Sequence, residues 1–471
     1  MRRIYGIDFR SLALFRQAIA LLYIFLACVV RFMYFEYYSV EHGPFRNEVM
    51  TKILNRPILC DIIHTDIGIS IAFALALVLG ILLFFEVFPS LVSFAALILF
   101  SLISRRFFPY FYGTDEVLVC ILFCLGFIYM LKHHANKSNP ILSLKEYPFI
   151  LLLLVQITII YWFNGLNKTH ETWWQGEAVS MAAFNMLFNK PLALQALKFH
   201  GINVFLTYLT LFFELLFPFL IFYPSKNGKI RFIAGILIVV FHWGIDLLAD
   251  VTLYKYAGIA FFFLFIPSYM WDRFPKMERI LIRSGKRMQV EVPTYFKKLA
   301  YILILVLSFK AVNASLQKQN LRYGFIKNKE VIEFMESCLS YSYSPFRQYW
   351  FMFAPSPPVN TGYIGFDYVE SNSIDNINIY GNNMPQKNFM YVHPFHMCCI
   401  IQYNSIEKGG MPQENEFVLT HLFDYFVNKN IRQHPERKME NYQLVLYKQS
   451  YEDFKRSKKY NLERIIIGSY K

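Results

Sequence analysis

The sequence predicts a polytopic α-helical membrane protein, with about eight or nine transmembrane helices followed by a small extramembrane α/β domain. Three observations support this fold class. The chain is 55% hydrophobic and only 17% charged. Its apolar residues are gathered in runs long enough to cross a bilayer. A more polar, mixed stretch follows the last run. We therefore expect a transmembrane domain over residues 1–315 and an extramembrane domain over residues 316–471.

Each predicted span is an apolar run bounded by polar or basic residues. A run at 299–314 is the least certain span. Residues 166–200 are too polar to span and too apolar for a free loop, so we expect one or two helices lying in the membrane interface there. The other eight runs cover residues 11–31, 66–86, 88–104, 116–131, 147–165, 201–223, 231–249 and 253–270.

The C-terminal domain is predicted from alternating strand patterns around one helical pattern. Residues 415–431 place apolar side chains at helical spacing. Alternation over 362–371, 376–382 and 441–449 predicts strands, the first two joined by a turn. These patterns indicate a small sheet with one covering helix.

The distribution of Lys and Arg predicts the orientation of the chain. With the N-terminus inside, the inner segments hold roughly twice as many of these residues as the outer loops. We therefore expect a cytoplasmic N-terminus and a C-terminal domain on the outer face, with a bacterial inner membrane as the favoured location. Without the span at 299–314, the C-terminal domain would move to the cytosolic side.

The net charge of +14 fits membrane lipids as partners, because Lys and Arg lie mainly between the apolar runs and in the C-terminal part. We do not expect nucleic-acid binding, since no basic-aromatic reading motif accompanies the charge. The seven cysteines show no CxxC and no Cys/His ligand spacing, so no metal ion is expected.

The end of the fifth span carries the first candidate site. An apolar run leads into Asn164, Asn167 and Lys168, then Trp173 and Trp174. Lys168 is either a lysine that snorkels to the headgroups or a desolvated amine whose lowered pKa lets it act as a base. The two amides could orient this amine, and the paired indoles would fix the depth of the segment.

Polar residues inside later spans are further candidates, because charged groups at membrane depth are costly. His242 and Asp246 lie one helical turn apart. They could form a proton relay, or a polar pair that only satisfies itself. We interpret Glu214 as a carboxylate that bridges helices rather than as a catalytic group, and His134 as an interfacial residue.

Four stretches carry a resemblance to a known family. In order along the chain they resemble the HTTM (horizontally transferred transmembrane domain) proteins, which are related to vitamin K-dependent gamma-carboxylase. The resemblance covers most of the chain and implies the fold of that family. The stretches are IDFRSLALFR, YWFNGLNKTHETWWQGEA, FHWGIDLLADVTLYKYAGIAFFFLFIPS and RQYWFMFAPSPP.

The resemblance also implies a chemistry. In the carboxylase, a lysine in a G-x-x-K stretch deprotonates reduced vitamin K. Oxygenation then gives a strong base that removes a γ-proton from a peptide glutamate, so that carbon dioxide can add. Lys168 falls on that lysine, His242 matches an F-H pair of the family, and His134 falls near a histidine that follows the fourth span. The implied reactants are reduced vitamin K or menaquinol, O2, CO2 and a secreted peptide.

Lys168, His242 and His134 are thus the expected catalytic residues. The candidate residues for binding substrate or quinol are Asn164, Asn167, Trp173, Trp174, Glu214 and Asp246. The main alternative is a non-carboxylating HTTM factor for maturation, binding or export of a secreted peptide. A transporter ranks third, because the chain shows no evident inverted repeat.

Overall fold

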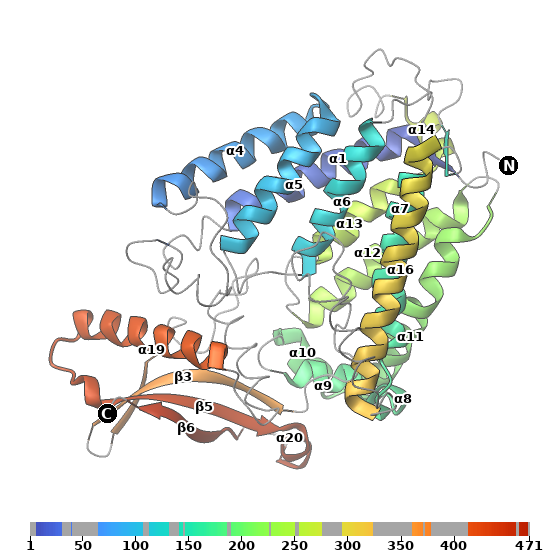
Figure 1. Cartoon of the computed structure of the whole chain (residues 1–471). Coiled ribbons are helices and arrows are strands. Elements are labelled where there is room, and N and C mark those ends of the chain that lie inside the picture. Colours follow the sequence, from blue (N-terminus) through green and yellow to red (C-terminus); the bar gives the residue numbers. More distant parts are fainter. Residues whose placement is uncertain are drawn as a thin grey trace.

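The computed structural model is mostly helical, with a small antiparallel sheet near the C-terminus (Figure 1). The residues that the structure describes are 6–30, 39, 65–106, 113–130, 141–144, 147–185, 190–225, 228–249, 254–275, 294–323, 360–370, 373–377, 413–457 and 461–469.

Within these residues, six helices are long and apolar enough to cross a membrane, which makes the chain an integral membrane protein. The first combines α1 (Phe9–Ile24) with most of a π-helix, η1 (Phe25–Val30). The last is α16 (Thr294–Tyr323), which is apolar over Thr294–Leu316 and covers the uncertain span at 299–314. The other four are α4 (Asp66–Phe84), α7 (Pro148–Leu166), α11 (His200–Phe222) and α12 (Lys229–Leu248).

The expectation of eight or nine full spans is confirmed only in part. The expected spans 88–104 and 116–131 correspond to α5 (Pro89–Arg106) and α6 (Gly113–Met130). The expected span 253–270 is divided into α13 (Tyr254–Leu264) and α14 (Ser268–Arg273). Proline disfavours helical geometry in the residue before it, so Pro267 explains the early end of α13. At 11 residues, α13 is too short to cross a bilayer alone.

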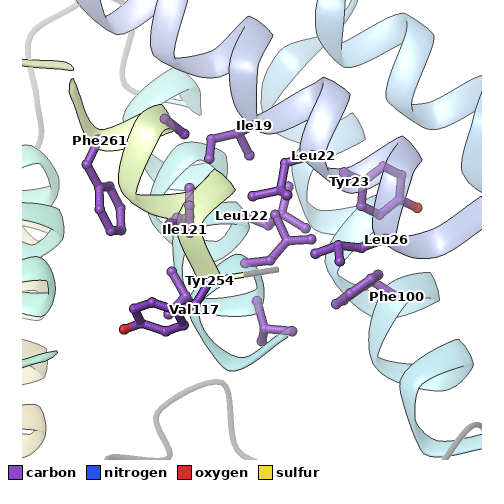
Figure 2. Packing of buried hydrophobic residues seen from close by; sticks show 14 of the residues in the cluster. Ile19, Leu22, Tyr23, Leu26, Phe100, Val117, Ile121, Leu122, Tyr254 and Phe261 are labelled. Atoms are coloured by element: carbon purple, nitrogen blue, oxygen red, sulfur yellow. The ribbon is translucent and has the colours of Figure 1, made fainter. Parts of the chain in front are cut away.

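Helix α7 lies inside the bundle and positions the candidate site. Most of α7 is buried, whereas most of α12 is not. Helix α7 contacts α6, α11 and α16, and α1 contacts α4 and α13. Figure 2 shows apolar packing in another part of the bundle, where Ile19 and Leu22 of α1 meet Ile121 and Leu122 of α6. The buried side of the bundle is therefore formed by aliphatic and aromatic side chains.

The segment between α7 and α11 forms three short helices at one end of the bundle (Figure 1). They are α8 (Glu171–Trp174), α9 (Ala178–Phe184) and α10 (Pro191–Ala196). Short helices were expected here, although one or two rather than three. Pro191 opens α10 at a position that needs no backbone N–H donor, which favours a helix start there.

The C-terminal part contains a four-stranded antiparallel sheet in the order β4-β3-β5-β6. The expected strands 362–371 and 441–449 and the expected helix are present as β3 (Asn360–Glu370), β5 (Tyr442–Ser450) and α19 (Gln413–Gln433). Strand β4 (Ser373–Ile377) includes only the first two residues of the expected strand 376–382, and the rest of that range lies outside the described residues. Strand β6 (Glu463–Ser469) was not expected. Phe423 and Phe426 of α19 pack on Phe366 of β3, with ring centroids 5.4 and 5.5 Å apart. Helix α19 therefore covers one face of the sheet.

A short helix, α20 (Tyr451–Ser457), joins this sheet to the interfacial segment. Phe184 at the end of α9 packs against Tyr451 and Phe454, with ring centroids 5.4 and 4.7 Å away. Beside them Lys455 donates to Glu177 at 2.8 Å. The sheet therefore lies at the same end of the bundle as α8, α9 and α10 (Figure 1).

Candidate functional site

Lys168 lies two residues beyond α7, with only 2% of its surface exposed. Its Nζ donates to both carboxylate oxygens of Glu214, at 2.9 and 2.7 Å, and to the backbone carbonyl of Asn164 at 3.3 Å. The lysine therefore does not extend to the headgroups as a snorkelling side chain. It forms a buried ion pair that joins the end of α7 to the middle of α11.

Gly165 makes this pairing sterically feasible. A Cβ at position 165 would lie 3.1 Å from Cβ of Glu214 and 3.2 Å from Cδ2 of Leu215. Such a contact is tighter than usual, so the glycine lets α7 and α11 approach closely at a point three residues before Lys168. The G-x-x-K spacing thus places the glycine at the helix contact and Lys168 next to the carboxylate.

The two indoles after Lys168 have different environments. The ring centroid of Trp173 lies 4.9 Å from Nζ of Lys168, within cation–π range. Trp173 is buried with Ala178 and Leu211. Trp174, by contrast, is 60% exposed. A buried indole inside the protein cannot sit among the headgroups, so the expectation of a pair of depth-setting indoles is wrong for Trp173. Gly176 turns the chain with φ of +79° and faces Val204 of α11.

The two asparagines contact the site through different groups. Asn164 offers its backbone carbonyl to Lys168. The Oδ1 of Asn167 accepts a hydrogen bond from the Ser315 hydroxyl of α16. Both asparagines are buried. Asn167 therefore links the site to α16.

Burial and the partner's charge act in opposite directions on the pKa of Lys168 in the Lys168–Glu214 pair. Desolvation by burial lowers the pKa of Lys168, and the adjacent Glu214 carboxylate opposes that shift. In a low dielectric, moving one proton across the 2.7 Å contact would convert two charges into a neutral amine and a neutral acid. This pair can therefore supply or accept a proton inside the bundle.

A second polar pair lies deeper along the same helix. The Tyr161 hydroxyl of α7 is 2.7 Å from Nε2 of His242 in α12, and both side chains are buried. Phe213 and Phe217 of α11 pack on the Tyr161 ring, with centroids 5.9 and 4.6 Å away.

His242 and Asp246 do not pair with each other, so neither the proton relay nor the polar pair considered for them is present. Oδ1 of Asp246 accepts from Lys190, before α10, and from Lys255 of α13, each at 2.8 Å. The carboxylate of Asp246 is thus occupied by the two lysine side chains and not by the imidazole. Asp246 therefore ties the interfacial segment to α12 and α13. His134 lies outside the described residues.

The two buried pairs share the contact between α7 and α11. Tyr161 precedes Lys168 by seven residues and lies within α7. Glu214 lies next in sequence to Phe213, which packs on Tyr161. The structure thus brings Asn164, Lys168, Trp173 and Glu214 together, whereas His242 contacts α7 at Tyr161.

Comparison with known proteins adds no relative. No protein-family model, curated protein or solved structure matches the chain. Among the described residues, no three His, Cys, Asp or Glu side chains gather as metal ligands.

Two site residues were missed from the sequence, Tyr161 and Tyr254. Tyr161 lies seven residues before Lys168, a spacing that would put both on one face of a helix continued through Lys168. Tyr254 opens α13, and its ring centroid is 5.4 Å from that of His242. Only the spacing of Tyr161 offered a signal that could have been used.

Proposed function

We propose that this protein is an HTTM-type membrane enzyme that uses the Lys168–Glu214 pair in quinol-dependent chemistry, coupled to carboxylation of glutamate in a secreted peptide. The observation that carries the proposal is the burial of an amine and a carboxylate, 2.7 Å apart, in the membrane part of the chain. Buried ionisable groups at membrane depth are rare and are commonly functional.

The surroundings suit a flat, apolar ring that bears oxygens. Aromatic side chains from α11 and α12 stack beside Tyr161, with the Phe213 and Phe241 rings 4.2 Å apart. Lys168, just beyond α7, and Tyr161, within α7, are both buried polar side chains. A quinol bound there would supply a hydroxyl proton and, with O2, the oxidising chemistry that the family resemblance implies.

The residues of the chain supply the proton handling. Glu214 accepts the proton of Nζ at Oε2, which leaves Lys168 as a neutral amine. That amine can then take a hydroxyl proton at Nζ, and the resulting ammonium balances the negative charge left on the donor oxygen. Trp173, 4.9 Å from Nζ, further stabilises the ammonium form.

The test uses purified protein with O2, CO2 and either reduced vitamin K or menaquinol, and measures epoxide by chromatography. The variant is the double substitution Lys168→Met with Glu214→Met, because removing both charges avoids leaving one charge buried alone. Lys198→Met, at an exposed lysine, is the matched control. We expect epoxide from the wild type and the control and none from the double variant. Absence of epoxide with both quinols would refute the proposal.

The tight pairing of Lys168 favours a second candidate function, a non-carboxylating factor for maturation, binding or export of a secreted peptide. A lysine held on both oxygens of a carboxylate can act as a purely structural link between helices. In this case the double variant would release as much peptide as the wild type, measured by mass spectrometry of the medium. Disruption of the sheet contact at Tyr451 would instead abolish release.

A further inference from the structure

Three buried rings meet where α7, α12 and α13 converge. They are Tyr161, His242 and Tyr254, all at most 5% exposed. Tyr161 and His242 are joined by the 2.7 Å contact, and the rings of His242 and Tyr254 are 5.4 Å apart. The three side chains therefore form one polar cluster inside an otherwise apolar part of the bundle.

The Tyr254 hydroxyl has no hydrogen-bond partner within the part of the chain that the structure describes. Figure 2 shows its ring at the margin of the apolar cluster, with the hydroxyl directed away from Ile19 and Leu22. A buried hydroxyl without a partner costs free energy, so native proteins seldom keep one without a ligand or water for it.

Gly258 shows that the position of the His242 ring is specified by the sequence. A Cβ at position 258 would lie 2.1 Å from Cδ2 and 2.7 Å from Nε2 of His242, too close for any other residue. This glycine stands one turn after Tyr254 on α13. Helix α13 thus makes room for the imidazole with one residue and presents a buried hydroxyl beside it with another.

We propose that the Tyr254 hydroxyl donates a hydrogen bond to an oxygen of a planar quinone-type ligand, bound beside the Tyr161–His242 pair. This inference rests on the proposed quinol chemistry at Lys168. It adds a binding residue that faces a ring oxygen distant from the amine. Tyr161 acts as a positioning residue here, because it holds His242 through Nε2.

The test is a binding titration with a short-chain naphthoquinone on the purified full-length protein, followed by tryptophan fluorescence quenching. Tyr254→Phe removes only the hydroxyl, so the variant is expected to fold with an unchanged or higher Tm. We expect its Kd for the naphthoquinone to rise at least tenfold. Tyr256→Phe is the matched control on the same helix, where the ring packs against Phe25, and its Kd should equal that of the wild type.

The outcomes separate this inference from the proposed function. Equal affinity of wild type and Tyr254→Phe would overturn the binding role of Tyr254. It would mean that the Tyr254 hydroxyl forms a hydrogen bond only to water. The chemistry at Lys168 would still stand if epoxide forms. A Tyr254-dependent Kd without any Lys168-dependent epoxide would support the site and refute the reaction. A wild type that does not bind the naphthoquinone would overturn both.

Discussion

Removing one member of the Lys168–Glu214 pair is expected to destabilise the protein far more than removing both. The side chains are only 2% and 7% exposed, and both carboxylate oxygens accept from Nζ. A single substitution, Lys168→Met or Glu214→Met, leaves the other group buried without its partner. Such a change costs about 3–5 kcal/mol, whereas replacing a buried pair by apolar residues is often neutral.

The assay is thermal unfolding of the four proteins of this double-mutant cycle in the same detergent. With a conversion of about 2 °C per kcal/mol, each single variant should lose at least about 6 °C in Tm. The double variant should unfold near the wild-type temperature. Lys198→Met, at an exposed position, should change the free energy of unfolding by less than about 0.5 kcal/mol. A double variant as destabilised as the sum of the two singles would show that the groups do not interact.

Three other changes test the surrounding structure. Gly258→Ala should displace the His242 ring and lower Tm by several degrees, whereas Gly244→Ala, with open space around its Cβ, should not; equal effects would contradict the packing. Asp246→Asn removes a carboxylate shared by two lysines, so Tm should fall at low salt and recover at high salt as repulsion is screened. Phe184→Ala should cost about 3–5 kcal/mol at the contact with α20 and speed proteolysis of the C-terminal part, and an unchanged cleavage rate would argue against that contact.

The membrane helices were predictable because long apolar runs leave few other structures open to the backbone. The ends of the helices were less so. Residues 253–270 read as one apolar run, yet the helix ends at Leu264 because Pro267 restricts the backbone before it. Strand β6 was missed because its pattern is one short run of three isoleucines without alternation. Its assignment as a strand depends on its pairing with β5, which the sequence does not show.

Within the candidate site, the sequence indicated Lys168 but not its partner. Glu214 lies 46 residues further along, and their contact depends on how closely α7 and α11 pack at Gly165. The expected link between His242 and Asp246 failed for a related reason. Helical spacing brings two side chains near each other, but it does not reveal competing lysines that arrive from other segments.

The contact between α9 and α20 has a consequence for how the chain is assembled. Lys455 and Glu177 are 278 positions apart, so their contact cannot form until nearly the whole chain has been synthesised. Phe184 is fully buried in the finished protein, but Tyr451 and Phe454, which cover its ring, are synthesised only near the end of translation. A premature stop before α20 would leave this ring uncovered at the end of the bundle, where quality-control proteases can recognise it.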